Sequence, residues 1–217
     1  PKLDNIFLDC GARSAKEVKE MGIEVGNVVT YKDKFMIMNK RFFVGRALDN
    51  RIGGFMIAEV ARLLKENKIK LPFGLYITNS VQEEVGLRGA EMITETIKPN
   101  VAIVTDVTHD THTPMINKIK EGDCAMEKGP VVTFGPSVQN NLLKLIIKTA
   151  KKNKIDIQRA AASRSTGTDT DAFAFNTGGV ASALISLPLR YMHTTVETVA
   201  QKDVENVIKL IYNSLLN

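Results

Sequence analysis

The chain has 217 residues, of which 44% are hydrophobic, enough for one sizeable core with at most a small satellite. No apolar run approaches the roughly 20 residues of a membrane-spanning helix, and the chain does not start like a signal peptide. The formal charge of +5 is spread along the chain and there is no Trp, so we expect neither a nucleic-acid nor a membrane partner. Cys10 and Cys124 are far apart and indicate reduced thiols in a cytoplasmic protein.

The first 45 residues have the pattern of short β-type segments around one small helix. Residues 6–8 and 28–31 are strand-like, and residues 14–21 form a short amphipathic pattern closed by Gly22. We interpret residues 1–45 as the end of a small β-rich module.

From Val44 onward, strand patterns alternate with helical patterns. Helices are predicted at residues 51–66, 90–97, 140–152, 169–176 and 204–216, and strands at 73–78, 101–105, 155–160 and 180–187. This alternation predicts an α/β fold in three layers, with a mostly parallel central sheet and helices on both faces. Residues 46–217 would form this main domain.

Acidic residues follow two of the predicted strands. Glu83 and Glu84 come after the strand at 73–78, and Asp106 directly follows the strand at 101–105. Two adjacent carboxylates repel each other unless each is solvated or paired. A metal ion would pair them, with one carboxylate as ligand and its neighbour as general base.

Two more polar residues are expected at the same edge of the sheet. His193 follows the strand at 180–187 after a short linker, and Asp49 precedes the helix at 51–66. Ligands bind at the carboxyl ends of strands in open α/β sheets. Carboxylates with an imidazole and no cysteine suit a catalytic zinc, cobalt or manganese site.

Each of these residues also has a simpler interpretation. Asp49 could be only the N-cap of the following helix, Asp106 could form an Asx turn, and His193 could be a loop histidine paired with Glu197. His109 and His112 lie shortly after Asp106; they fit a polar surface loop, although proximity to the site would allow them to act as ligands.

Five segments of the chain, in order, resemble the tetrahedral (TET-type) metallo-aminopeptidases, which are also described as glutamyl or deblocking aminopeptidases and often labelled cellulases. The resemblance runs from Asp4 to the C-terminus. The segments that carry it are Ala47-Leu48-Asp49-Asn50-Arg51, Val81-Gln82-Glu83-Glu84-Val85-Gly86-Leu87-Arg88-Gly89, Val104-Thr105-Asp106-Val107-Thr108, Thr166-Gly167-Thr168-Asp169 and Pro188-Leu189-Arg190-Tyr191-Met192-His193.

The resemblance implies a dinuclear site that holds zinc or cobalt. Asp49 would bridge the two ions, Glu83 would be the general base and Glu84 would ligate one ion, while Asp106 and His193 would be further ligands. The family's remaining ligand, a histidine in an upstream His-x-Asp motif, has no counterpart in these residues. The resemblance also implies a cis Asp49–Asn50 peptide, and it makes residues 1–45 the end of an inserted β-rich domain and residues 46–217 the main part of the catalytic domain.

The resemblance further suggests a substrate pocket and an assembly. Thr166, Gly167, Thr168 and Asp169 would line the pocket. Arg190 and Tyr191 are additional pocket candidates, although Arg190 could equally pair with a carboxylate. Family members form a dodecamer built from dimers, so a homo-oligomer that acts on peptides is expected.

We therefore predict a metal-dependent aminopeptidase with a glutamate general base. One alternative is an inactive or metal-deficient fragment or subunit of such an enzyme. A more remote alternative is a glycoside hydrolase, which would need two carboxylates across a sugar ring and, for stacking, aromatic platforms that this chain of 6% aromatic residues hardly offers.

Overall fold

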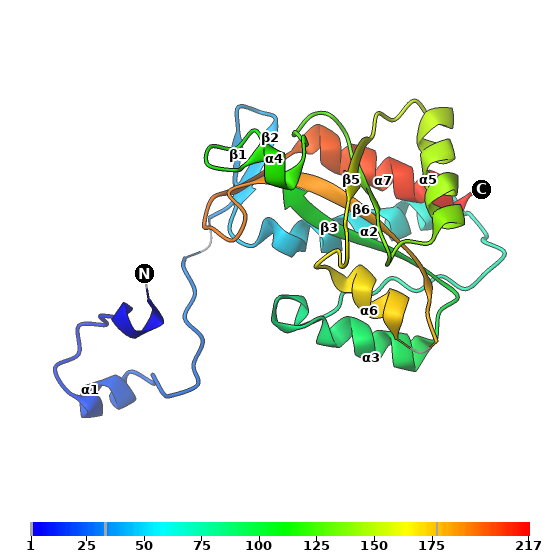
Figure 1. Cartoon of the computed structure of the whole chain (residues 1–217). Helices are drawn as coiled ribbons and strands as arrows, with labels where there is room; N and C mark the ends of the chain where they lie inside the picture. Colours follow the sequence, from blue (N-terminus) through cyan, green and yellow to red (C-terminus); the bar gives the residue numbers. More distant parts are fainter. Residues whose placement is uncertain (1, 33, 177) are drawn as a thin grey trace. The chain divides into compact units, whose positions relative to one another are not determined.

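A computed structural model describes residues 2–32, 34–176 and 178–217 (Figure 1). The chain divides into two compact units, Pro1–Lys32 and Asp33–Asn217. In the described part of the first unit, a 3-10 turn, η1 (Leu3–Asn5), is followed by the helix α1 (Ala15–Glu20). Ser14 caps α1 by accepting a hydrogen bond from the N–H of Glu17 at 3.2 Å, which confirms the predicted helix.

The strands predicted at residues 6–8 and 28–31 are wrong, because neither segment is in a ladder. Phe7 is 87% exposed and Val28 89% exposed. A strand is stable only when a neighbouring strand accepts its hydrogen bonds and a core covers its apolar side chains, and the described residues supply neither to these two segments.

The second unit contains one mixed sheet. Its strands are β1 (Met36–Met38), β2 (Phe42–Gly45), β3 (Val101–His109), β4 (Val131–Phe134), β5 (Gln158–Ala161), β6 (Ala181–Arg190) and β7 (Glu197–Ala200). They run in the order β1-β2-β7-β6-β4-β5, and β3 pairs with β6. In the part of the chain that the structure describes, β3–β6 and β4–β5 pair in parallel, and the other four pairings are antiparallel.

The α/β class with helices on both faces is confirmed, but the sheet is mixed rather than mostly parallel. Parallel neighbours need a long crossover, usually a helix. The connection from β3 to β4 carries only the one-turn helix α4 (Lys118–Glu121), and a short loop joins β6 to β7. In both places the chain reverses its direction.

Helices cover both faces of this sheet (Figure 1). On one face lie α2 (Leu48–Glu66), α5 (Asn140–Lys152) and α7 (Gln201–Leu215), which share the larger apolar core with β6. On the other face α3 (Arg88–Ile97) and α6 (Asp169–Phe175) enclose a smaller core. All five helices were predicted, with ends that differ by a few residues. No helix of the described residues is long and apolar enough to cross a membrane.

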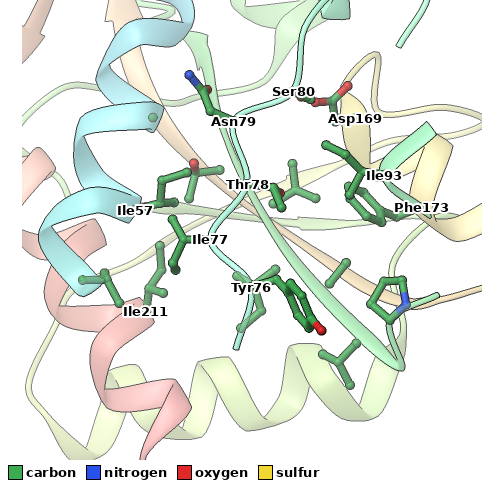
Figure 2. Close-up of a pocket in the computed structure, with 18 of the residues that line it drawn as sticks. Ile57, Tyr76, Ile77, Thr78, Asn79, Ser80, Ile93, Asp169, Phe173 and Ile211 are labelled. Atoms are coloured by element: carbon green, nitrogen blue, oxygen red, sulfur yellow. The ribbon is translucent and has the colours of Figure 1, made fainter. Parts of the chain in front are cut away.

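The strands predicted at 101–105, 155–160 and 180–187 correspond to β3, β5 and β6, whereas the buried strand predicted at 73–78 is wrong. That segment is in no ladder of the described residues, and Tyr76 is 67% exposed. Its side chains alternate as in a strand: Ile77 lies on the side of α2 and α7, and Thr78 on the side of Phe173 (Figure 2). The segment therefore shows the side-chain alternation of a strand at Ile77 and Thr78, without a strand neighbour among the described residues.

Candidate metal centre

Asp49, Glu84 and His193 come together from α2, the 3-10 turn η2 (Glu83–Val85) and the β6–β7 loop. His193 Nε2 lies 3.1 Å from Asp49 Oδ2 and 3.5 Å from Glu84 Oε2. Nitrogen and oxygen ligands about 2.0–2.1 Å from a tetrahedral ion lie about 3.3–3.4 Å from one another. The two distances from His193 therefore fit a zinc-sized ion, and the ligand atoms of all three residues lie within 4.8 Å of one another.

Asp49 belongs to an irregular start of α2. Ala47 is left-handed with φ of 53°, the Asp49–Asn50 peptide is cis as expected, and Asp49 has non-helical backbone angles. The Asn50 amide donates to the carbonyl of Thr105 at 2.9 Å and accepts from the N–H of Gly53 at 2.9 Å. The side chain that caps the regular part of α2 is therefore that of Asn50, and the interpretation of Asp49 as a simple N-cap is wrong.

The loop that carries Glu83 and Glu84 is held by its own backbone. The N–H of Leu87 donates to the carbonyl of Glu83 at 3.0 Å, and the N–H of Gly89 donates to the carbonyl of Val81 at 2.9 Å. A Cβ at position 89 would collide with the Val81 backbone. The glycine that ends this motif is therefore required by the close approach of two backbone segments.

Five carboxylates line one cavity of about 930 Å³. Burial, reinforced by the neighbouring carboxylates, raises the pKa of Asp49 to about 6, of Glu83 to about 7 and of Asp106 to about 8. The other two members are Glu84 and Asp169, and Asp169 is the carboxylate that raises the pKa of Glu83 most. This cluster of like charges would be stabilised by a bound cation.

Asp169 lies beside Ser80 at this cavity (Figure 2). Ser80 Oγ donates to Asp169 Oδ2, while Asp169 Oδ1 is buried and accepts no hydrogen bond from the described residues. Burial raises the pKa of Asp169, and the bond from Ser80 opposes that effect. A buried acceptor without a donor is the kind of group that a cation or a water molecule satisfies.

Asp106 lies inside β3 rather than after its end, because the strand continues to His109 in register with β6. Its Oδ1 accepts from the N–H of Val107 at 2.8 Å, and only 6% of the residue is exposed. The Asx-turn interpretation is therefore wrong.

His193 is left-handed, with φ of 60°. Its backbone N–H donates to Glu197 Oε1 at 2.7 Å. The pairing with Glu197 thus exists through the backbone, and the imidazole remains directed at Asp49 and Glu84.

Among the residues expected to bind substrate, Asp169 lines the cavity and the other five are not among its lining residues. The N–H groups of Thr166 and Gly167 donate to the Asp171 carboxylate, and Thr168 caps α6. The substrate-binding role of this loop is still a prediction.

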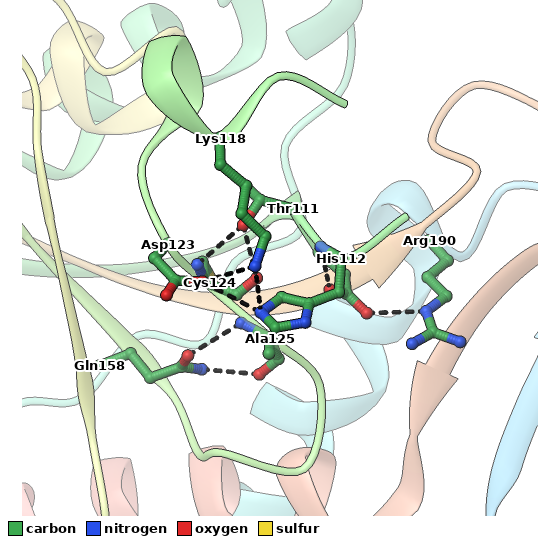
Figure 3. Close-up of polar contacts among 9 residues, drawn as sticks. Thr111, His112, Lys118, Asp123, Cys124, Ala125, Gln158 and Arg190 are labelled. Carbon is green, nitrogen blue, oxygen red and sulfur yellow. Dashed lines mark hydrogen bonds and ion pairs between the residues drawn. The ribbon is translucent and has the colours of Figure 1, made fainter. Parts of the chain in front are cut away.

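Arg190 and Tyr191 lie at the end of β6 and just after it. Arg190 Nε donates to Oδ2 of the fully buried Asp110 at 2.7 Å (Figure 3). The predicted alternative, in which Arg190 pairs with a carboxylate, is therefore confirmed. Tyr191 is 43% exposed. A substrate-binding role for either residue is still a prediction.

Neither His109 nor His112 belongs to the three-residue group found among the described residues. His112 Nε2 lies 3.0 Å from Asp123 Oδ1 and 2.8 Å from Lys118 Nζ in an exposed cluster (Figure 3). This surface position agrees with the polar-loop interpretation for His112. That interpretation is wrong for His109, which is the last residue of β3 and pairs with β6.

Sequence reasoning anticipated the pairing of His193 with Glu197 but missed the other bonds that hold the site residues in place. Asn50 ties the Asp49 loop to β3, Ser80 holds Asp169, Asp171 holds the loop at 166–167, and Glu197 contacts two candidate ligands. Each of them lies within a few residues of a motif that was recognised. The partners of Asn50 and Ser80 are distant in the sequence, whereas Asp171 accepts from nearby backbone N–H groups, which no sequence pattern marks.

Comparison with known proteins places these observations in a family. Residues 1–210 match the model of the M42 glutamyl aminopeptidases. The lysyl aminopeptidase of Pyrococcus furiosus is 38% identical over 95% of the chain and 58% of its own length. Two solved structures are similar to this chain. One is a TET aminopeptidase from a marine sediment archaeon, with a TM-score of 0.87 and 35% identity over 94% of this chain and 58% of that one. The other is PhTET1-12s, a dodecamer, with a TM-score of 0.80 and 29% identity over 94% of this chain and 60% of that one.

Proposed function

Because the chain belongs to the M42 glutamyl aminopeptidase family, we propose that it is the metal-binding part of an aminopeptidase that removes N-terminal residues from peptides. The observation that carries this proposal is the convergence of Asp49, Glu84 and His193 at ligand spacing. The chain spans 58% of the lysyl aminopeptidase it matches, and the activity is proposed for the protein to which these residues belong.

Asp49, Glu84 and His193 would hold one divalent ion, zinc or cobalt, and Asp106 with the shared Asp49 would contribute to a second. The charge of Asp49 contributes to the raised pKa of Asp106, which supports the proximity of the two carboxylates. When bound, the ions would polarise the peptide carbonyl and lower the pKa of the attacking water.

Glu83 is the residue that we assign to proton transfer. It lies next to the candidate ligand Glu84, is partly exposed, and has a pKa raised to about 7 by burial and by neighbouring carboxylates. A carboxylate with a pKa near neutrality can accept a proton from water and return it to the leaving amine. Thr166, Gly167, Thr168, Asp169, Arg190 and Tyr191 would contact the peptide.

The remaining expectations are part of the same proposal. Residues 1–45 would end an inserted β-rich domain and residues 46–217 would form most of the catalytic domain, in a cytoplasmic homo-oligomer like the dodecameric relative. A glycoside hydrolase is not favoured, because that chemistry leaves the imidazole of His193 without a role.

Cobalt titration combined with hydrolysis of an aminoacyl anilide tests the proposal. We expect the chain to bind Co²⁺, His193→Ala to lose that binding, and the matched control His112→Ala to keep it. Turnover of the anilide would support the peptidase, whereas binding without turnover would support the alternative of a fragment that lacks part of the site. Absence of Co²⁺ binding would overturn the proposal.

A further inference from the structure

Glu197, the first residue of β7, is a buried carboxylate at the back of the candidate metal centre. It is 2% exposed. Its Oε2 accepts from the backbone N–H of Asp49 at 3.0 Å, and its Oε1 accepts from the backbone N–H of His193 at 2.7 Å. One side chain therefore contacts two candidate ligands, of which Asp49 lies 148 positions earlier in the chain.

Both of these amides belong to irregular backbone. Asp49 interrupts the start of α2 with non-helical angles, and His193 is a left-handed residue other than glycine. Neither amide donates to a backbone carbonyl of the described residues, so the Glu197 carboxylate supplies the acceptor that regular structure would otherwise provide. Hydrogen bonds to an ionised acceptor are roughly twice as strong as those between neutral groups.

The two hydrogen bonds fix the backbone positions from which the Asp49 and His193 side chains extend. The two oxygens of the Glu197 carboxylate bind the backbones of Asp49 and His193. In the side chains of these two residues, His193 Nε2 lies 3.1 Å from Asp49 Oδ2. Burying a carboxylate is costly unless its oxygens are paired, and here both oxygens are paired with ligand residues.

We propose that Glu197 is a positioning residue of the metal centre: its buried carboxylate sets the separation of Asp49 and His193 without touching the ion. This proposal rests on the metal binding proposed above. Residues that orient ligands without binding the metal typically contribute 10–100-fold to metal affinity. Glu197 supplies that orientation through the ligands' backbone rather than through their side chains.

The test compares Glu197→Gln with Glu205→Gln, an exposed glutamate on α7 whose partner is Lys209 at 3.8 Å. In Glu197→Gln one acceptor oxygen is replaced by a donor that faces an N–H group. Two readouts are needed: hydrogen exchange of the Asp49 and His193 amides in the metal-free chain, and Co²⁺ affinity with the visible Co²⁺ spectrum.

We expect the variant to exchange at least one of the two amides roughly 10-fold faster, and to bind Co²⁺ about 10–100-fold more weakly with an altered spectrum. The amide of Ile185 in β6 and the Glu205→Gln variant should be unchanged. If Glu197→Gln does not fold, Glu197→Asp keeps the charge, is too short to reach both amides, and should show the same two effects.

Unchanged exchange of both amides, or unchanged Co²⁺ affinity, would overturn the positioning role. A wild-type chain that binds no Co²⁺ would instead overturn the proposed function. In that case the exchange rates alone would decide whether Glu197 holds the two segments.

Discussion

At the scale of single residues, two adjacent glutamates differ in what surrounds them. Glu84 lies 3.5 Å from His193 Nε2 and its side chain is 56% exposed. Glu83 is less exposed, and Asp169 raises its pKa more than any other neighbouring charge. Glu84 is thus close to His193, whereas Glu83 is influenced most by Asp169, and this difference supports different roles for the two glutamates.

The pair can be separated by two amide substitutions. Glu83→Gln should keep Co²⁺ binding while lowering kcat of the intact enzyme by about 10²–10⁴-fold, because it removes proton transfer. Glu84→Gln should weaken Co²⁺ binding itself, because it replaces a charged ligand. Glu91→Gln, an exposed glutamate on α3, is the matched control. Equal loss of metal from the first two variants, measured by equilibrium dialysis, would contradict these roles.

Asp106 should make the stability of the metal-free chain depend on pH. Its folded pKa of about 8 lies above the ordinary value of 3.8, so the folded state favours the protonated carboxyl. That contribution is fully present below about pH 4 and is lost as pH rises toward 8, at up to about 1.4 kcal/mol per pH unit.

Asp106→Asn removes the titration while keeping an acceptor for the Val107 N–H. With EDTA present, the unfolding temperature of the variant should rise relative to wild type as pH increases from 4 to 8, by at least about 5 °C. A difference that stays constant over this range would show that Asp106 does not titrate in that window.

At the scale of elements, the start of α2 combines two adjacent glycines with opposite requirements. A Cβ at Gly53 would collide with the Asn50 side chain, which binds the Thr105 carbonyl. A Cβ at Gly54 would meet the Asn79 side chain at 3.5 Å, an ordinary contact. The first glycine is therefore required by the Asp49 loop, whereas the second is replaceable.

The two alanine variants should move stability in opposite directions. Gly53→Ala should lower the free energy of unfolding by about 1–3 kcal/mol and weaken Co²⁺ binding, because Asn50 is displaced. Gly54→Ala should raise it by about 0.5–1 kcal/mol, because alanine is the better helix former. Urea titration measures both values, and a similar effect of the two variants would contradict the assigned role of Asn50.

At the scale of the whole molecule, the candidate ligands come from three elements that only folding brings together. The unfolded chain therefore lacks the site, and a metal that binds the folded state must stabilise it. At a Co²⁺ concentration 100 times the Kd, stability should rise by about 2.7 kcal/mol. Thermal unfolding with and without Co²⁺ measures this, and His193→Ala should abolish the shift; an equal shift in both proteins would indicate binding elsewhere.

The edge of the sheet should promote association. β1 is the terminal strand in the pairing order, and Met36, Ile37 and Met38 are 46%, 56% and 45% exposed. Exposed apolar edge strands pair with other chains. We expect light scattering to report association that increases with concentration and decreases in Ile37→Lys. A monomer at all concentrations would contradict this.

The sequence by itself determined the elements that local patterns encode. Residues 140–152 carry apolar side chains at helical spacing, and the helix has these bounds; the strand at 101–105 was recognised from its apolar run. Asp49, Glu84 and His193 were also selected from their motifs, and the structure brings these three side chains together; their role as ligands stays a prediction.

Tertiary structure alone decided what depends on partners distant in the chain. The segment at 73–78 has a strand pattern but is in no ladder, and the sheet is mixed, because both properties depend on which strand lies alongside. The same holds for Glu197, whose position in the sequence gave no sign of its bond to Asp49. Local propensity acts between near neighbours, whereas hydrogen bonding and burial act between whichever groups the fold brings into contact.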